Sequence, residues 1–335
     1  MRFAVATTMR NEGAFAAEWI VWQRMIGFEG ILVLSNDCDD RTPRLLDAFE
    51  GAGWITHVPY TPKPDRPPKQ TAHPRMRRHP MTRETDWLMV CDVDEFLVIH
   101  EGGGTLADLI PQDAPFEGMA VHWRNFGYAP TWRWWPGLAH RQMTRAGPPQ
   151  HPVDRSFKSI FRPTRFGSFG AHAPWRFDGE WAREGRGWVD SQLRPMDVDP
   201  DARPMHTHPS AITHRRAQIN HYALRAKEHF LAKRGTPSSV AGVDRYTDDF
   251  VAMHDRVEME DRSALRHAAR FDALWEEAMA LPGVARLHRL CEADHVARLM
   301  RNRGRDHKLD PRWRKRLRAA KAAGPGGPGR RAAVS

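Results

Sequence analysis

The sequence has little cysteine, no long apolar run and no signal-peptide pattern at its start. Its 335 residues include 3 cysteines, which are Cys38, Cys91 and Cys291. This odd and widely spaced set argues against a disulfide framework and against a zinc site, and it favours a reducing compartment. The apolar runs are a few residues long, far below the ~20 that a membrane-spanning helix needs. We therefore expect a cytoplasmic protein.

The sequence also lacks the two common phosphate-binding loops. No G-x-G-x-x-G follows the first expected strand, and G-x-x-x-x-G-K-[ST] does not occur. A protein of this sequence that binds a nucleotide must therefore hold the phosphates with a metal ion and with side chains.

The surplus of basic residues is confined to the C-terminal end. The net charge is +10, yet residues 301–335 hold 12 Lys/Arg against 2 acids, and the rest of the chain holds 39 of each sign. Because the body is neutral and has no basic stripe, we expect no specific nucleic acid partner. The basic, glycine-rich end predicts a disordered tail over 304–335. This tail is either a solvated extension or a peripheral contact of residues 301–335 with anionic lipid at the inner face of the membrane.

Alternating strand and helix patterns in the first hundred residues predict a mostly parallel sheet with helices between its strands. Strands are expected at 3–8, 31–34, 54–58 and 88–91. Asn11 is a candidate cap for a helix with one apolar stripe, and Thr42 begins the next helix. Pro74 and Pro80 predict that the helix before the fourth strand is broken.

The pattern changes beyond residue 118. Further strands are expected at 119–123 and 157–161, followed by helices at 225–234, 244–260, 261–281 and 283–303. We predict three parts from these patterns. They are an α/β domain over 1–235, a helical extension over 236–303 and the tail over 304–335.

The most informative stretch is Trp87–Phe96, in which an apolar strand is followed by Asp92, Asp94 and Glu95. Asp-x-Asp occurs four times in the chain, but this pair alone ends a strand that could hold both side chains rigidly. Carboxylates so close together cannot pair with one another. They need a cation, and hard oxygen ligands suit Mg²⁺ or Mn²⁺. A solvated acidic turn is the alternative interpretation.

Six short stretches, taken in order, carry a family resemblance. They are Met9–Glu12, Leu34–Thr42, Asp92–Leu97, Trp123–Gly127, Phe157–Pro163 and Ile219–Tyr222. With these stretches the chain resembles the family 2 glycosyltransferases, in a bacterial subgroup similar to the family 92 glycosyltransferases. The resemblance covers about residues 3–235. It implies the GT-A fold, which is an α/β arrangement of a mixed sheet with flanking helices, followed here by a helical C-terminal region.

The resemblance also implies a nucleoside-diphosphate sugar as the donor, with UDP as the expected nucleotide, and Mn²⁺ or Mg²⁺ as the metal. It makes Asp94 a metal ligand and puts Asp92 on a metal-bound water or on the ribose. His221 is implied as a further metal ligand, because neutral imidazole tolerates Mn²⁺. A core histidine that is hydrogen-bonded to the backbone is an equal alternative for His221.

Five further residues are implied as donor-binding residues. Asn11 and Glu12 follow the first strand and would line the nucleotide pocket, and Asp37 would lie near the base or the ribose. Lys158 and Arg225 are cations suited to diphosphate oxygens. Simpler roles compete with each assignment, namely a helix cap for Asn11, a turn for Asp37 and a surface charge for the two cations.

Transfer with inversion at the sugar carbon needs a general base for the acceptor hydroxyl. Four carboxylates lie in the expected stretch: Asp154, Asp178, Glu180 and Asp190. We favour Asp154 as the catalytic base. Glu95 is a second candidate, although its place in the motif suits support of the metal site.

Aromatic residues are concentrated in one loop and could stack on the apolar faces of an acceptor sugar, although core packing explains some of them. They are Trp123, Phe126, Tyr128, Trp132, Trp134 and Trp135.

The sequence therefore predicts a metal-dependent, inverting glycosyltransferase that uses a nucleoside-diphosphate sugar and a glycan or lipid-linked acceptor, in the synthesis of a cell-surface polysaccharide. Two other classes remain as alternatives. A metal-dependent phosphoesterase or nucleotidyltransferase would use the same acidic run but needs a second carboxylate pair. A nucleic-acid-binding module would rely on the basic tail.

Overall fold

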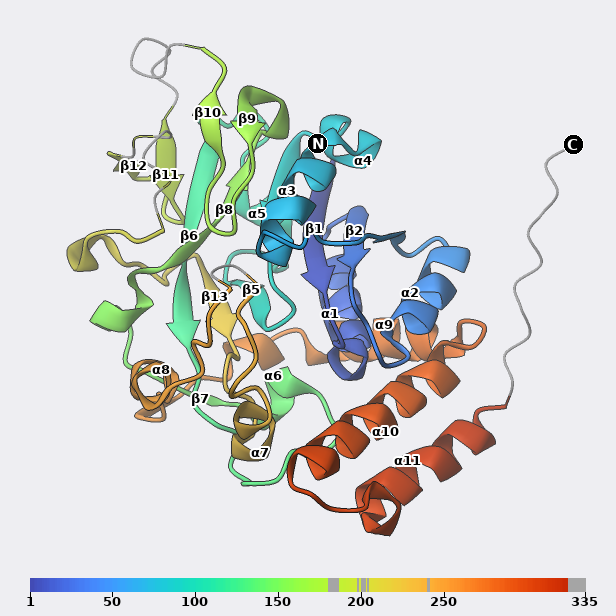
Figure 1. The fold of residues 1–335 in the computed structure, drawn as a ribbon. Coiled ribbons are helices and arrows are strands. Elements are labelled where there is room, and N and C mark those ends of the chain that lie inside the picture. The colour runs from blue at the N-terminus through green and yellow to red at the C-terminus, as the bar shows by residue number, and fades with distance from the viewer. Residues whose placement is uncertain (180–186, 198, 200–202, 204, 240–241, 325–335) are drawn as a thin grey trace, which may run out of the picture.

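The computed structural model describes residues 1–179, 187–197, 199, 203, 205–239 and 242–324 (Figure 1). Its strands are β1 (Phe3–Met9), β2 (Gly30–Ser35), β3 (Thr56–Pro59), β4 (Trp87–Val90), β5 (Glu95–Ile99), β6 (Gly118–Asn125), β7 (Arg145–Ala146), β8 (Phe157–Phe161), β9 (Phe166–Ser168), β10 (Trp175–Phe177), β11 (Trp188–Asp190), β12 (Pro195–Met196), β13 (Ala217–His221) and β14 (Met259–Glu260). Its α-helices are α1 (Gly13–Met25), α2 (Thr42–Gly51), α3 (Pro68–Arg78), α4 (Pro80–Arg83), α5 (Leu106–Leu109), α6 (Ala139–Gln142), α7 (Lys227–Leu231), α8 (Asp248–His254), α9 (Ala268–Ala280), α10 (Val284–Asn302) and α11 (Pro311–Ala322).

A mixed sheet forms the centre of the molecule, with the strand order β12-β11-β6-β8-β4-β1-β2-β3. Strands β1 to β4 pair in parallel, as their alternation with helices predicts. β8 then inserts antiparallel between β4 and β6, and β13 pairs with both β5 and β6. The α/β fold class predicted from the sequence, a mixed sheet with flanking helices, is confirmed.

Alternate residues of the central strands enter two different hydrophobic layers, because successive side chains of a strand point to opposite faces. On β1, Phe3 and Val5 belong to the layer that contains α1, whereas Ala4 and Ala6 belong to the layer that contains α3. Helices therefore cover both faces of the sheet (Figure 1).

Helix α1 is buried on almost all sides, so the single apolar stripe predicted for it is too narrow. The sheet covers one side of the helix, and α9 and α10 pack against it as well. A helix that is enclosed in this way carries apolar residues all round. Asn11 does not cap α1: the cap position is Glu12, without a side-chain hydrogen bond. The backbone N–H of Gly13 instead donates to Oγ1 of Thr42 at 2.8 Å.

The proline prediction before the fourth strand is confirmed. α3 ends at Arg78 with Pro74 inside it, and α4 starts at Pro80. The four predicted C-terminal helices are also present, although α7, α8 and α9 are shorter than expected.

The prediction of a disordered tail from residue 304 is wrong for its first part. Residues 311–322 form α11, which packs along α10 (Figure 1). The helix is held by Arg312, which is buried and donates to Glu228 at 2.7 Å and to Asp310 at 2.8 Å. Residues 325–335 lie outside the described residues. In the described part of the chain, none of the helices has the length and apolarity to cross a membrane.

The C-terminal helices share a hydrophobic core with the sheet. Phe271 of α9 and Leu299 of α10 belong to the same buried cluster as Trp19 of α1. The boundaries at 235 and 303 therefore stay a prediction about domains, drawn within a region that packs on one core.

Candidate active site

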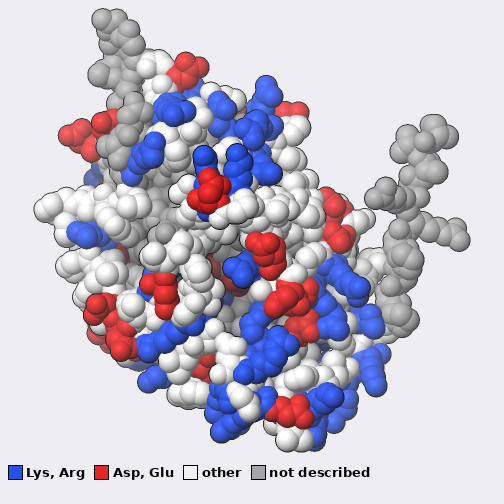
Figure 2. Space-filling view, viewed as in Figure 1, with Lys and Arg blue, Asp and Glu red and all other residues white. Residues whose placement is uncertain are grey.

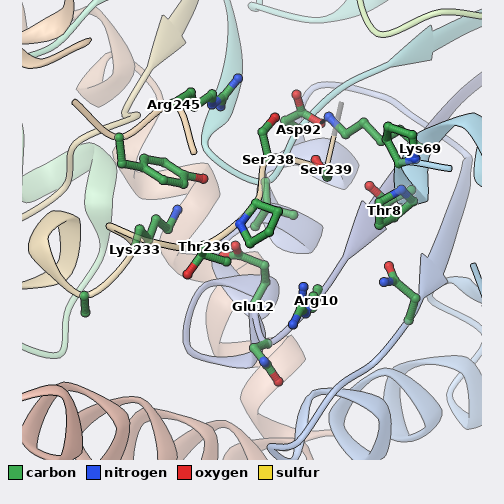
Figure 3. Close-up of a pocket in the computed structure, with 18 of the residues that line it drawn as sticks. Thr8, Arg10, Glu12, Lys69, Asp92, Lys233, Thr236, Ser238, Ser239 and Arg245 are labelled. Carbon is green, nitrogen blue, oxygen red and sulfur yellow. Dashed lines mark hydrogen bonds and ion pairs between the residues drawn. The ribbon is translucent and has the colours of Figure 1, made fainter. Parts of the chain in front are cut away.

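A cavity of about 810 Å³ opens at the carboxyl ends of β1 and β4. Its wall comes from the loops after these strands, from the start of α3, from residues 236–239, 242, 245 and 246, and from α10. The face in Figure 2 is hollowed near its centre, with charged side chains at the rim. Figure 3 shows Arg10, Lys69, Lys233 and Arg245 around the same space as Asp92. The site lies where open α/β sheets bind ligands.

Cations outnumber acids on the wall of this cavity. The lining Lys and Arg residues are Arg10, Arg66, Lys69, Lys233, Arg245, Arg298 and Arg301, and the lining acids are Glu12, Asp39, Asp65, Asp92 and Asp94. A concave surface lined mainly by one sign of charge attracts a ligand of the other sign. The cavity is therefore suited to an anion.

Asp92 is held by two lysines, one from a helix and one from a strand of the sheet. Lys69 of α3 binds its Oδ1, and Nζ of Lys158 on β8 lies 3.2 Å from its Oδ2. Burial opposes ionisation of this carboxyl, but the two lysines outweigh burial and hold the pKa of Asp92 well below its usual range. Both carboxylate oxygens of Asp92 are thus engaged by protein cations, so the cation that the sequence requires for Asp92 is supplied by lysine.

Glu95 supports this arrangement from below the cavity. Its Oε2 accepts from the backbone N–H of Asp92 at 2.8 Å and lies 2.9 Å from Nζ of Lys158. Burial raises the pKa of Glu95 to about 7, against the lowering effect of Lys158. Because Glu95 is 1% exposed and does not line the cavity, it fits the supporting role rather than that of a base.

Lys158 is a buried anchor rather than a surface charge or a wall residue. Its ammonium group also donates to the backbone carbonyl of Ala171 at 2.6 Å. Burial disfavours its charge, but Asp92 and Glu95 raise the pKa of Lys158 above its usual value. The lysine therefore stays charged and fixes the Asp92 carboxylate.

Asp94 faces the cavity and lies beside His221. The backbone carbonyl of Asp94 accepts from the N–H of Tyr222 at 2.8 Å, which ties the acidic loop to the end of β13. Burial opposes the charge on Asp94, but His221 and Lys233 lower its pKa. Among the described residues, none hydrogen-bonds or pairs with the Asp94 carboxylate, so its oxygens are open to a ligand.

His221 is buried, with its ring stacked on Trp123 at a centroid distance of 4.0 Å. Its Nδ1 lies 3.0 Å from Oδ1 of Asn125, so its hydrogen-bond partner is a side chain and not the backbone. Burial lowers the pKa of His221 to about 4, although Asp94 acts in the opposite direction. The imidazole is therefore neutral at pH 7, which is the form that binds metals.

The residues present fit a divalent metal in part. No group of three His, Cys, Asp or Glu side chains converges on a metal position within the described residues. Asp94 and His221 offer one carboxylate and one neutral imidazole, and Mg²⁺ or Mn²⁺ commonly completes its shell with substrate phosphates and water. A metal that is held by two protein ligands and completed by a diphosphate would suit this donor set.

Of the residues predicted to bind the nucleotide, some line the cavity and one does not. Asn11 and Glu12 line the cavity, whereas Asp37 is exposed and does not. Asp37 follows β2 at a positive φ of 45°, which turns its carboxylate away to accept from Asn36 at 3.0 Å. Asn11, also at positive φ, accepts from the backbone N–H of Asp39 at 2.9 Å and so shapes the rim.

Arg225 is a structural cation rather than part of the wall. It is buried, its guanidinium carbon lies 3.3 Å from the ring centroid of Phe15, and it donates to the carbonyl of Val93 at 3.4 Å. Its guanidinium is 3.8 Å from Oε2 of Glu12. Arg225 therefore positions both loops that carry the acidic residues.

The described candidates for the general base lie away from the cavity. Asp154 is 0% exposed, accepts a hydrogen bond from the side chain of Asn125, and does not line the cavity. Asp178 is exposed beyond β10, and Asp190 is held by Arg194 at 2.6 Å. Glu180 lies outside the described residues. Of the three that the structure describes, none lines the cavity.

The six aromatic residues of the predicted acceptor loop differ in burial. Phe126 and Trp134 are buried in the core, Trp123 stacks on His221, and Trp132 and Trp135 are 43% and 45% exposed. Core packing thus explains part of the cluster, and the two exposed tryptophans have Arg303 and Arg312 near their rings, at 4.7 and 5.8 Å from the ring centroids.

Sequence reasoning missed most of the cations on the wall. Lys69 follows Pro67 and Pro68, a signal for a helix start, but nothing nearby in the sequence marks Asp92 as its partner. Lys233 and Arg245 lie in stretches whose sequence pattern predicts helices and indicates no ligand. Lys69, Lys233 and Arg245 line the same cavity only because segments that are far apart in the sequence pack together.

A mixed sheet that carries its acidic run at the edge of a cation-rich cavity is the arrangement that the resemblance to GT-A glycosyltransferases implies. The sequence profile of Glycosyltransferase family 92 matches residues 5–230, and the chain belongs to this family. The resemblance and the enzyme class predicted from the sequence are thereby confirmed. Among curated proteins, none matches the chain.

Solved structures that match the chain include S. aureus TarS 1-349, with 10% identity over 96% of this chain and 92% of that chain and a TM-score of 0.35. The complex of S. aureus TarS 1-349 with UDP-GlcNAc matches with 10% identity, the same coverage and a TM-score of 0.33. HddC from Yersinia pseudotuberculosis matches with 8% identity over 57% of this chain and 91% of that chain, at a TM-score of 0.31.

Proposed function

We propose that this protein is a cytoplasmic, metal-dependent, inverting glycosyltransferase that moves a sugar from a UDP-sugar to a glycan or lipid-linked acceptor. The observation that carries the proposal is the cation-lined cavity at the end of β1 and β4 in a chain of glycosyltransferase family 92. The acceptor oxygen forms a bond to the anomeric carbon while the bond from that carbon to the diphosphate breaks. The acceptor proton passes to a base, and the nucleoside diphosphate leaves.

The cavity suits a nucleoside diphosphate in size and charge. Its volume of about 810 Å³ falls within the range of ligand pockets. Lys69, Lys233 and Arg298 approach from α3, the α7 end and α10, so cations surround the space from several sides. They are fixed before the reaction and would stabilise the charge that grows on the departing diphosphate.

Asp94 and His221 are the residues that would hold Mn²⁺ or Mg²⁺. When bound, the metal would neutralise the diphosphate as it leaves the sugar. Asp92 would not ligate the metal directly, because Lys69 and Lys158 take its two oxygens. Its charge would instead keep Lys69 at the edge of the diphosphate site.

We also propose that the enzyme meets anionic lipid through α11. This helix presents Arg314, Lys315, Arg318 and Lys321 as exposed residues, and basic side chains gather over α10 and α11 in Figure 2. Each cation near an anionic membrane contributes about 1 kcal/mol. Cosedimentation with phosphatidylglycerol vesicles, lost at high salt and absent with phosphatidylcholine vesicles, would support this contact. Equal binding to both vesicle types would contradict it.

The test of the main proposal uses UDP-, GDP- and TDP-sugars, each with and without Mn²⁺. We expect a rise in melting temperature and slow hydrolysis of one UDP-sugar, both dependent on Mn²⁺. Asp94→Asn should abolish the dependence on Mn²⁺, whereas the matched change Asp113→Asn, at an exposed carboxylate outside the cavity, should preserve it. A protein that responds to none of these donors would refute the proposal.

The same assay separates the alternatives. A phosphoesterase or nucleotidyltransferase would release phosphate or act on the phosphoanhydride bond, and the sugar would stay attached to its phosphate. A nucleic-acid-binding module would bind DNA or RNA and lose the binding on removal of residues 301–335. Inversion is read from the anomeric configuration of the product.

A further inference from the structure

Three buried polar side chains form a hydrogen-bonded chain that ends beside Asp94. Asp154 lies on the 3₁₀-helix η1 (Pro152–Arg155), Asn125 ends β6, and His221 ends β13. They are 0%, 0% and 3% exposed. Oδ1 of Asp154 lies 2.7 Å from Nδ2 of Asn125, and Oδ1 of Asn125 lies 3.0 Å from Nδ1 of His221.

The direction of these hydrogen bonds follows from the chemistry of the groups. An ionised carboxylate only accepts, so Asp154 takes hydrogen bonds from both the side-chain amide and the backbone N–H of Asn125, the latter at 3.0 Å. The reversed amide would bring its oxygen against the carboxylate. The oxygen of Asn125 must therefore face His221, and because this oxygen only accepts, Nδ1 of His221 must carry the proton.

The ring of His221 is also fixed in orientation. β13 pairs in parallel with β6, with His221 opposite Asn125, so both side chains leave neighbouring backbone positions. Trp123 stacks on one face of the imidazole and His254 meets it edge-on at a centroid distance of 5.2 Å. No described residue hydrogen-bonds Nε2, and Asp94 is the acidic residue that acts most strongly on the ring.

We propose that Asp154 and Asn125 are positioning residues that hold His221 as the Nδ1–H tautomer, with the lone pair of Nε2 presented beside Asp94 to the divalent cation. The inference rests on the proposed metal-dependent function, and it gives Asp154 a role that differs from the base predicted from the sequence. Metal-binding histidines commonly donate their second ring nitrogen to such a partner, which sets the tautomer and the ring orientation.

The first experiment reads the tautomer without a mutation. Long-range ¹H–¹⁵N spectra of ¹⁵N-histidine-labelled protein, with the signal of His221 identified by its loss in His221→Gln, report which ring nitrogen carries the proton. We expect the proton on Nδ1 at pH 7.5 in the absence of metal. A proton on Nε2 would overturn the proposal, and the tautomer itself is measured in the wild-type protein, with His221→Gln used only to assign the signal.

The second experiment uses Asp154→Asn, which keeps the shape of the side chain but allows the Asn125 amide to reverse. We expect a mixture of His221 tautomers and a loss of Mn²⁺ affinity of about 10-fold or more, measured by Mn²⁺ titration in the presence of UDP. Asp190→Asn is the matched control, because it makes the same change at a buried carboxylate that binds Arg194 instead. Its tautomer signal and Mn²⁺ affinity should match the wild type.

The outcomes distinguish the two proposals. If Asp154→Asn leaves both the tautomer and the Mn²⁺ affinity unchanged, the positioning role is refuted. If the wild type binds no Mn²⁺ with any nucleotide, the metal part of the proposed function fails. The tautomer of His221 in the wild type and in Asp154→Asn then still decides whether Asp154 and Asn125 set the ring.

Discussion

Replacement of Lys158 by methionine tests whether the charge cluster beneath the cavity is a buried ion pair. Methionine keeps most of the length and apolar volume of the side chain but removes the ammonium group. Lys158 has 1% exposure and contacts Glu95 at 2.9 Å and Asp92 at 3.2 Å. After the change Asp92 keeps Lys69, whereas Glu95 keeps no cation and only the backbone N–H of Asp92 and the weakly donating thiol of Cys91.

The expected cost follows from the unpaired buried charge. Removal of one partner from a buried ion pair typically costs about 3–5 kcal/mol, because the remaining charge keeps its desolvation penalty. We expect Lys158→Met to lower the free energy of unfolding by about this amount. Replacing the Glu95 carboxylate by a neutral amide should restore part of the lost free energy of unfolding. Lys158→Met/Glu95→Gln should therefore be more stable than Lys158→Met alone.

Urea unfolding followed by tryptophan fluorescence measures these free energies for the wild type, the two single variants and the double variant. Lys321→Met, at an exposed lysine of α11, is the matched control and should change stability by less than about 0.5 kcal/mol. A loss below about 1 kcal/mol for Lys158→Met would refute the reasoning, since it would mean that Glu95 is reached by water or takes up a proton once Lys158 is removed. Strict additivity of the two single changes would refute the coupling.

Three further predictions concern stability. Burial lowers the pKa of His122 from 6.5 to about 4, so between these pH values the unfolded state binds more protons, and His122 destabilises the fold by up to about 3 kcal/mol as the pH falls. In His122→Gln the free energy of unfolding should therefore fall less on acidification than in the wild type. An unchanged pH dependence would contradict this. Gly118→Ala should cost about 1–3 kcal/mol in urea unfolding, because the new Cβ would lie 2.1 Å from the ring of Trp188; wild-type stability would contradict it. Arg312→Leu removes the buried guanidinium that pairs with Glu228 and Asp310, and it should lower the free energy of urea unfolding by about 3–5 kcal/mol. A change near zero would mean that Arg312 does not anchor α11.

The parts of the fold that local rules control could be predicted from the sequence. The alternation of strands and helices fixes β1 to β4 as parallel neighbours, and Pro74 and Pro80 mark the break between α3 and α4. The acidic run after β4 reaches the cavity because the carboxyl ends of parallel strands share one edge of the sheet. These features depend on residues that are close in sequence.

The parts that depend on partners far apart in sequence could not be predicted. The run of arginines in α11 looks solvated in the sequence, but Arg312 pairs with Glu228, which lies 84 positions earlier in the chain. A basic composition predicts disorder only when its charges have no buried partner, and the sequence does not reveal the partner. The same limit applies to Lys69, whose contact with Asp92 depends on the packing of α3 on the sheet.

The two aspartates of the Asp-x-Asp motif therefore differ in a way that their spacing conceals. Both follow β4, but Asp92 is neutralised by lysines of α3 and β8, whereas Asp94 keeps its charge open to the cavity beside a neutral imidazole. An acidic pair in a sequence shows that cations are needed, but not which side chains or ions supply them. Here the protein supplies the cations for Asp92. In the proposed site the metal ion therefore binds at Asp94. Asp154 and Asn125 contribute by orienting His221 beside it through their hydrogen bonds.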